Sequence, residues 1–488
     1  MDLPWGSAVV LIPLVGALVC GVLSPRRTPA AGVITTVAVA VVSGGLVARV
    51  SSHGVYRESL GGWGAPVGIE LVVDGFGASM VAMTAIVAVA VSLYSVGYFR
   101  DVRSGESTSH HQGYFWSLWL VVWASLNGMF VSADLFNLYV AMEVMGLGAV
   151  ALVALVGRGA LGAAMRYLFV TLVGSMLYLL GVALLYAGWG VVDMEQLSLV
   201  VGSTPASQVA LAVMTVGLVL KTALVPLHFW LPAAHANAPA PVSAVLSALV
   251  VKATFYILVR LWVDVFAVVD TDTAAMALAA AGVIAVVWGS VQAFRQHRLK
   301  MLVAYSTVAQ LGILFVVFAP ATVDEAASMG WTGAAVFVVA HAVAKGALFL
   351  SAGAIGRAAG TDRFEALRGV GRRLWGPTAA FALGALALVG VLSVGSYTGK
   401  SLIVESAQQA SMPLVRLVVD AGAVLTALYA GRALVLLVKG SGDDQTPSVQ
   451  DVPTTMAVSA FVLAVVAVLM GPLSAWAVDT LQVGRSFV

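Results

Sequence analysis

Long apolar stretches separated by short polar connections run through the whole sequence. Each stretch has roughly the 20 residues that an α-helix needs to cross the hydrocarbon layer of a bilayer. We therefore predict an all-α polytopic membrane protein with fourteen transmembrane helices, the seventh and twelfth of them interrupted. These helices are expected near residues 6–24, 31–50, 74–99, 114–133, 135–156, 163–187, 208–225, 241–266, 272–294, 301–319, 331–356, 376–410, 413–438 and 454–478.

The composition agrees with this pattern. Of the 488 residues, 60% are hydrophobic and 10% are charged, whereas soluble domains carry about 25% charged residues. The net charge of +2 gives no reason to expect a nucleic acid partner. The single cysteine, Cys20, excludes an internal disulfide and a cysteine-based metal cluster. We find no Walker loop, no dinucleotide fingerprint and no metal-binding histidine spacing, so we expect no cofactor and no metal.

The charges in the connections predict the orientation of the chain. Basic residues gather in alternate connections, and the connections between them are acidic. The basic set includes Arg26, Arg27, Arg295, Arg298, Lys300, Arg363, Arg368, Arg372 and Arg373. The acidic set includes Asp193, Glu195, Asp264, Asp270, Asp272, Asp324 and Glu325, and Arg260 is one of the few basic residues in these acidic outer segments. Because Lys and Arg are retained on the cytoplasmic side, fourteen spans place both termini outside a prokaryotic plasma membrane.

Two of the predicted helices are interrupted. The first interruption follows Lys221, where four prolines occur between residues 226 and 241. The second precedes Lys400, where Gly395 and Gly399 are expected to loosen the helix. The interruptions lie five spans apart, which predicts two inverted five-helix repeats. We expect spans 1–3 in residues 1–112, the first repeat in 113–266, the second in 267–440 and the last span in 441–488.

Several titratable residues lie inside predicted spans, where each charge costs about 2.5–3.5 kcal/mol of insertion energy on the translocon scale. Six are candidates for a proton relay: Glu143, Lys221, Lys252, His341, Lys345 and Lys400. Burial disfavours the charged forms of both carboxylates and amines, so both can exchange protons near neutral pH. A Glu143–Lys221 pair would act as a switch, because moving the carboxylate away releases the proton of the lysine. Water and hydroxyl groups are expected to fill the gaps, from Thr222, Ser243, Ser247, Tyr305, Ser306, Thr307, Thr398 and Ser401.

Other polar residues have open assignments. His228 and His235 lie at the first interruption, where a proton-path role competes with capping or loop bonding. Asp74 opens a span and is interpreted first as a helix N-cap. Glu405 and Asp420 either face the outer water or line an exit. Any of the buried pairs could also simply hold helices together.

Three segments resemble a known family. They are Lys221-Thr-Ala-Leu-Val-Pro-Leu-His-Phe-Trp-Leu-Pro with the following Ala-Pro-Ala-Pro-Val-Ser-Ala and Lys252, the dipeptide Met142-Glu143, and Leu299-Lys-Met-Leu-Val-Ala-Tyr-Ser-Thr-Val-Ala-Gln-Leu-Gly. Together they are similar to the antiporter-like proton-translocating subunits of respiratory complex I, membrane-bound hydrogenases and Mrp-type sodium/proton antiporters. The resemblance implies proton-path roles for Glu143, Lys221, Lys252 and Lys400, and membrane subunits of a larger complex as partners.

Within that family, the length and Gly399-Lys-Ser-Leu-Ile resemble the D-type member of Mrp antiporters, whereas the Ala-His-Ala-Asn-Ala-Pro segment looks closer to hydrogenase and complex I relatives. We therefore expect a subunit that carries protons in exchange for sodium. The first alternative is a subunit of a redox-driven pump. Of the two, we favour the subunit of a secondary transporter over that of a redox enzyme. The second alternative is a membrane scaffold that no longer conducts.

Overall fold

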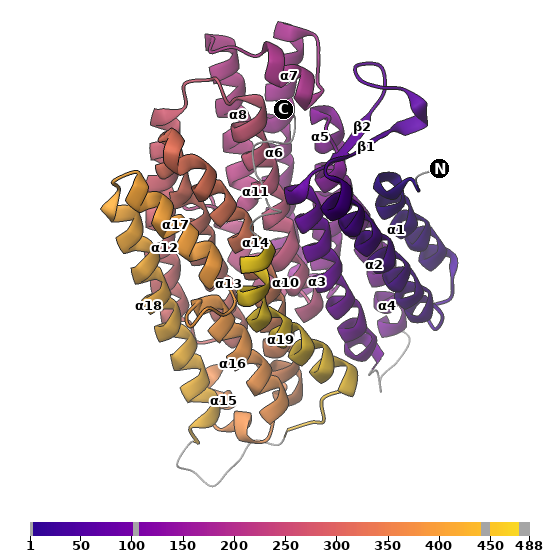
Figure 1. Cartoon of the computed structure of the whole chain (residues 1–488). Helices are drawn as coiled ribbons and strands as arrows, with labels where there is room; N and C mark the ends of the chain where they lie inside the picture. Colours follow the sequence, from indigo (N-terminus) through magenta and orange to yellow (C-terminus); the bar gives the residue numbers. More distant parts are fainter. Residues whose placement is uncertain (1–2, 101–106, 441–448, 478–488) are drawn as a thin grey trace.

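The computed structural model describes residues 3–100, 107–440 and 449–477, and most of these are helical (Figure 1). Within these ranges, thirteen helices are long and apolar enough to cross a membrane. The interrupted twelfth span is present as two shorter helices. The prediction of an all-α polytopic membrane protein is therefore confirmed. Parts of the predicted first and last segments, residues 1–2, 101–106, 441–448 and 478–488, lie outside the described residues.

The elements follow one another in this order. The first half has α1 Trp5–Val22, α2 Thr28–His53, β1 Tyr56–Ser59, η1 Leu60–Gly62, β2 Glu70–Val73, α3 Gly75–Arg100, α4 Ser107–Val131, α5 Leu135–Ala154, α6 Arg158–Trp189, α7 Met194–Val200, α8 Pro205–Thr222, α9 Trp230–Asn237, α10 Ala240–Val245, η2 Leu246–Val250, α11 Val251–Arg260 and η3 Leu261–Val265. The second half has α12 Asp272–Arg295, α13 Leu299–Phe315, η4 Val316–Phe318, η5 Pro320–Thr322, α14 Asp324–Ala359, α15 Phe364–Leu367, η6 Val370–Arg372, α16 Trp375–Val389, α17 Tyr397–Gln409, α18 Pro413–Val438 and α19 Thr454–Ala477. The segments η2 and η3 are π-helical and continue the eighth span without a break.

Both predicted interruptions are present, but their details differ from the prediction. After α8 the chain leaves helical geometry from Ala223 to Phe229, and Pro232 lies in the first turn of α9. Proline is tolerated there because the first N–H groups of a helix have no intrahelical partner. Residues 390–396 separate α16 from α17, and Gly399 lies inside α17 rather than loosening it.

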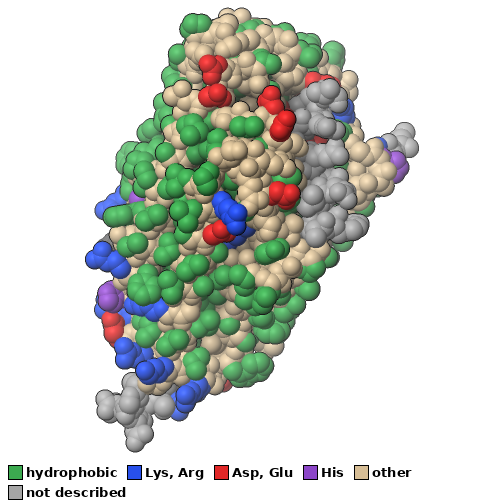
Figure 2. All heavy atoms as spheres, turned by 60° about the vertical axis from the view of Figure 1, so that its left-hand side comes forward, with side chains coloured by type: hydrophobic (Ala, Val, Ile, Leu, Met, Phe, Trp, Pro, Cys, Tyr) green, Lys and Arg blue, Asp and Glu red, His purple; other side chains and the backbone are tan. Residues whose placement is uncertain are grey.

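The two ends of the bundle differ in structure and charge. At one end, the hairpin end, β1 pairs with β2 in an antiparallel hairpin and Arg57 of β1 forms an ion pair with Glu195 of α7. The opposite end, the arginine end, carries Arg298, Arg357, Arg363, Arg368, Arg372 and Arg373. On the face in Figure 2, most Lys and Arg side chains lie in the lower half and most acidic side chains in the upper half. The described residues thus show the charge asymmetry that the sequence predicts.

The eighth span and α14 are the most enclosed elements of the bundle. All of the apolar window of residues 240–265 and 94% of that of α14 are buried, against 33% of that of α1. The long helix α14 packs against α3, α13, α16, α17 and α19. A charged side chain on either element is therefore surrounded by protein rather than by lipid.

Each of the two interrupted spans has one close backbone contact with a long neighbouring helix. Between α6 and α8, a Cβ at Gly217 would lie 2.4 Å from the carbonyl oxygen of Gly174. Between α14 and α17, a Cβ at Gly399 would lie 2.5 Å from the backbone nitrogen of Phe337. Small residues let helix backbones approach this closely in membranes. Both contacts join the third and fourth helices of a predicted five-helix unit, which is the relation that an internal repeat requires.

The contact at Gly399 generates a stability prediction. Gly399→Ala should lower the unfolding temperature of the purified protein in detergent, because overpacking costs about 1–3 kcal/mol. Gly431→Ala in α18 is the matched control, since its Cβ meets nothing within 4 Å. Removal of a helical glycine there should leave stability unchanged or raise it by roughly 0.5–1 kcal/mol. Equal unfolding temperatures for the two variants would show that α14 and α17 separate without cost.

Candidate functional site

The six candidates predicted inside the spans lie in the interior on five helices, and are called the buried row below. They are Glu143 on α5, Lys221 on α8, Lys252 on α11, His341 and Lys345 on α14 and Lys400 on α17. All except Glu143 are at most 5% exposed, and the Glu143 side chain is 16% exposed. The structure therefore brings together residues that are up to 257 positions apart in the sequence (400 − 143).

Glu143 and Lys221 form the first pair of the buried row. The Lys221 Nζ lies 3.5 Å from Glu143 Oε1, and it also donates to the Thr171 carbonyl at 3.2 Å and to the Ser175 hydroxyl. The carboxylate is thus the most distant of three acceptors. Such a pair can separate while the ammonium keeps its other two hydrogen bonds.

Both interruptions contain non-glycine residues in the left-handed region of backbone space. Ala223 follows Lys221 and Thr222 with φ 62°, and Leu392 and Ser393 have φ 55° and 58° between α16 and α17. Non-glycine residues adopt this conformation at a cost of about 1–3 kcal/mol, and such strain gathers at functional sites. Each interruption therefore places a lysine next to strained backbone.

Pairs of hydroxyl groups lie between the helices that carry Lys221, Lys252 and Lys345. The Thr222 and Thr254 hydroxyls lie 2.9 Å apart and join α8 to α11, one residue after Lys221 and two residues after Lys252. The Ser247 and Thr307 hydroxyls lie 2.8 Å apart, joining η2 to α13. Of the hydroxyl residues predicted to bridge the relay, Thr222, Ser247, Ser306 and Thr307 therefore lie between the lysines.

Lys252 and Lys345 have neutral partners. The Lys252 Nζ donates to the Ser247 carbonyl, which belongs to the π-helical η2. The Lys345 Nζ donates to the Val303 carbonyl at 3.1 Å and to the Ser306 hydroxyl. Because π-helical turns shift the backbone hydrogen-bond pattern, they often occur at functional sites. Neither lysine forms an ion pair with a carboxylate among the described residues.

His341 lies between Lys345 and Lys400. Its ring stacks on Phe337 at 5.5 Å between centroids, and the Lys400 Nζ lies 5.6 Å from the centre of the same Phe337 ring. The Lys400 Nζ donates to the Leu388 and Val389 carbonyls, both at 2.9 Å, at the end of α16. The lysines whose charges act on His341 are Lys252, Lys345 and Lys400. The histidine therefore lies close enough to all three lysines to be affected by their charges.

His235 of α9 is fully buried and stacks on Phe349 of α14 at 4.6 Å. Neither ring nitrogen of His235 or of His341 has a hydrogen-bond partner among the described residues. Buried polar groups are usually paired, so each orphan needs a reason. The lysines that act on His235 are Lys300, Lys345 and Lys252, which places this histidine beside the buried row.

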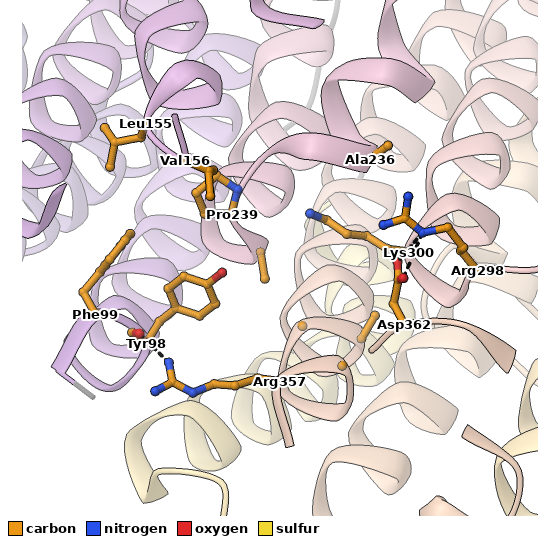
Figure 3. Close-up of a pocket in the computed structure, with 14 residues that line it drawn as sticks. Tyr98, Phe99, Leu155, Val156, Ala236, Pro239, Arg298, Lys300, Arg357 and Asp362 are labelled. Carbon is orange, nitrogen blue, oxygen red and sulfur yellow. Dashed lines mark hydrogen bonds and ion pairs between the residues drawn. The ribbon is translucent and has the colours of Figure 1, made fainter. Parts of the chain in front are cut away.

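A cavity of about 420 Å³ opens at the arginine end beside α9 (Figure 3). Its lining includes Tyr98, Ala236, Pro239, Arg298, Lys300, Arg357 and Asp362. Arg298 pairs with Asp362 at 2.8 Å, and the Lys300 Nζ donates to the Ala238 carbonyl. Figure 3 shows the Lys300 side chain extending away from the Arg298–Asp362 pair toward Pro239. Lys300 therefore lines this cavity, and its charge also acts on His235.

Some predicted residues lie away from the buried row. His228 is half-buried and accepts a hydrogen bond from Trp288 of α12 at 3.3 Å, so it faces the edge of the bundle. Glu405 is exposed, and Asp420 pairs at 3.7 Å with Arg416, with both of these side chains exposed. Thr398 bonds to the Gly471 carbonyl and Ser401 to its own helix. The expected N-cap of Asp74 is present, because its carboxylate accepts the Gly77 N–H at 2.8 Å.

The sequence reasoning missed two sets of polar residues. It treated Lys300 as a charge of an inner connection, although its neighbours place it beside His235. It also treated Arg260 and Asp264 as outer-segment charges, although both are buried with Asp74. Lys252, Tyr256, Arg260 and Asp264 follow one another at intervals of four residues. This spacing could have indicated that Arg260 and Asp264 share a helix face with the buried Lys252.

A family model described as NADH:quinone oxidoreductase/Mrp antiporter, TM, matches residues 132–426, which is more than half of the chain. The chain belongs to this family. The segment that matches the family model includes all six residues of the buried row. The chain is therefore a membrane-spanning subunit of a family whose members carry ions.

Individual relatives come from both branches of the family. The chain is 32% identical over 437 residues to the N-type member of NADH-quinone oxidoreductase from Desulforudis audaxviator (strain MP104C), covering 87% of this chain and 85% of the relative. It is 29% identical over 406 residues to the D-type member of the Na(+)/H(+) antiporter from Bacillus subtilis (strain 168), covering 81% and 79%. A chain of the Mrp complex from Dietzia sp. DQ12-45-1b has the same fold, with a TM-score of 0.87, 23% identity and coverage of 99% and 98%.

The burial of Lys345 without a carboxylate generates a prediction on stability. Lys345→Met should raise the unfolding temperature in detergent by a few degrees, because an uncompensated buried ion is replaced by an apolar side chain of similar volume. Lys439→Met at the exposed end of α18 is the control and should leave it unchanged. A fall in unfolding temperature for Lys345→Met would show that the ammonium holds α13 and α14 together.

Proposed function

We propose that this chain is the proton-translocating subunit of an Mrp-type sodium/proton antiporter in a prokaryotic plasma membrane. Protons move inward through the buried row and drive sodium export by the complex. The observation that carries the proposal is the succession of separate hydrogen-bonded pairs between Glu143 and Lys345, namely Glu143–Lys221, Thr222–Thr254, Ser247–Thr307 and Ser306–Lys345. Intramembrane ionisable groups that face one another mark ion pathways.

The hairpin end faces the outside in this proposal, and the arginine end faces the cytoplasm. The support is the positive-inside rule together with the gathering of arginines at one end. Both termini then lie outside. The cavity beside Lys300 opens toward the cytoplasm, and the interruption before Lys400 lies at the other end of the buried row.

Protons would exchange with the cytoplasm through the cavity, Lys300 and His235. The charges of Lys300, Lys345 and Lys252 all act on His235, which supports a position for this histidine between the cavity and the buried row. His341 then links Lys345 and Lys252 to Lys400. An amine among neutral buried groups exchanges its proton more readily than one paired with a carboxylate, which suits Lys252, Lys345 and Lys400 to this role.

Glu143 and Lys221 would act as the switch. When the carboxylate is near, it favours the charged lysine, and when it moves away the proton leaves toward Thr222 and Thr254. A void lined by Lys221, Thr171 and Thr254 lies in this gap but has no room for a water molecule. Opening of that void is therefore the step that would connect Lys221 to Lys252.

A redox-driven pump is the second candidate. It is favoured by the 32% identity to an N-type member of NADH-quinone oxidoreductase. The same buried row would serve either complex, so the partner proteins decide between them. Purification in mild detergent separates the candidates, because an antiporter brings small membrane subunits and a redox pump brings iron–sulfur proteins.

Replacement of the switch carboxylate tests the relay. Glu143→Ala should lower proton flux in everted membrane vesicles by roughly 100-fold or more, as expected for the loss of a positioned proton-transfer group. Sodium resistance of an antiporter-deficient host should be lost with it. Glu405→Ala, which removes an exposed carboxylate, should change neither. Retained flux in Glu143→Ala would favour the scaffold alternative.

Filling the cavity tests the cytoplasmic route. Ala236→Phe should slow proton flux in everted vesicles without lowering the unfolding temperature, because the ring occupies space in front of Lys300. Ala233→Phe, one turn earlier on α9, is the matched control because Ala233 does not line this cavity. Equal flux in the two variants would exclude the cavity as the cytoplasmic opening of the path.

A further inference from the structure

A second polar line leaves the buried row along α11. Lys252, Tyr256 and Arg260 follow one another at intervals of four residues within an α-helix, so they share one face. Asp264 continues the spacing in η3. At about 1.5 Å per residue, Arg260 lies roughly 12 Å from Lys252 toward the hairpin end. This line points from the proposed proton path directly to the end that we assign to the outside.

Arg260 is held by a fixed set of acceptors. Its Nε donates to the Tyr256 hydroxyl at 3.0 Å, one terminal nitrogen donates to Asp264 at 3.1 Å, and the other donates to Asp74. Arg260 and Asp74 are 3% exposed and Asp264 is 9% exposed. Two carboxylates around one guanidinium keep it in one position and keep it charged.

Aromatic rings close the space around the guanidinium. The Arg260 guanidinium carbon lies 5.6 Å from the centre of the Phe76 ring and 5.0 Å from that of Tyr256. Tyr256 in turn packs against Phe76 at 4.9 Å and Phe130 at 5.2 Å. All three aromatic residues are at most 2% exposed. The segment between Lys252 and Arg260 is therefore tightly packed, and its only polar side chains are Thr254, which bonds to Thr222, and the Tyr256 phenol.

The direction of the hydrogen bonds opposes proton movement along this line. The Tyr256 hydroxyl donates to the Phe130 carbonyl at 3.2 Å and accepts from Arg260. A proton moving outward through this phenol would have to be handed to the guanidinium. Arginine has no acceptor and does not lose its own proton in proteins. The line is thus polar but cannot pass protons.

We propose that the Asp74–Arg260–Asp264 cluster is an electrostatic seal that stops protons on Lys252 from leaking directly to the hairpin end, and so directs them sideways to Lys345 and Lys400. This rests on the proposed proton path. A fixed guanidinium that excludes protons and cations is an established means of selectivity in membrane pores. Lysine at the same place would keep the charge but could release a proton.

Arg260→Lys tests the seal in the complex purified with its partner proteins and reconstituted into liposomes. Passive proton influx is followed with an internal pH dye under a potassium diffusion potential. The seal predicts a several-fold higher proton leak than in the wild type, and addition of Lys252→Met should remove it. An ion pair that only joins α3 to α11 predicts wild-type permeability, and that result would overturn the proposal.

Two further variants complete the test. Tyr256→Phe should not leak and should keep normal exchange, because the phenol carries no protons, whereas loss of exchange would reveal an outward proton wire and contradict the seal. Arg260→Gln combined with Asp264→Asn removes one cation and one anion together, and it should leak like Arg260→Lys. Failure of both Arg260 variants to assemble would assign Arg260 to structure alone and overturn the proposal. If Glu143→Ala exchanged ions at the wild-type rate, the proposed relay would be refuted instead. Failure of the seal and failure of the relay are therefore distinguishable.

Discussion

The cost of a charge in an apolar interior determines how this structure is built around its buried lysines. Lys252, Lys345 and Lys400 donate to backbone carbonyls and, in one case, to a serine hydroxyl, rather than to carboxylates. Neutral oxygens stabilise an ammonium enough to keep it in place but do not fix its proton. Arg260, held by two carboxylates, shows the opposite solution within the same helix bundle. The bundle thus contains lysines bound by neutral oxygens and an arginine bound by carboxylates.

The irregular backbone supplies the carbonyls that the lysines need. Lys400 binds the last carbonyls of α16, which are free because the helix ends at the interruption. Lys252 binds a carbonyl of the π-helical η2, and Lys300 binds the carbonyl of Ala238 at the end of α9. Irregular backbone at membrane depth is tolerated only where protein or water satisfies it. Here the lysines and the interruptions satisfy each other, which explains why they occur together in the sequence.

Most of the fold could be predicted from the sequence because the bilayer imposes a simple length and hydropathy rule. The spans, the two interruptions and the buried row follow from that rule and from charges that violate it. The site was less predictable where partners come from distant helices. Nothing local shows that His228 faces α12 while His235 faces α14, because that depends on how α9 packs. Lys300 was missed because a lysine near a span end is expected to be solvated, and Arg260 because its carboxylate Asp74 is 186 residues away.

The geometry also explains why protons would travel sideways rather than straight across. From Lys252, the outward direction along α11 meets aromatic rings and a guanidinium that cannot accept a proton, while the lateral direction meets hydroxyls, amines and His341 with its unpaired ring nitrogens. The lateral route passes from the helices around the first interruption to those around the second. A proton that enters from the hairpin end would therefore reach Lys252 only through Lys400, His341 and Lys345. Such a route places the Glu143–Lys221 switch and the outer opening in different halves of the chain, so that a change at one can be sensed electrostatically at the other.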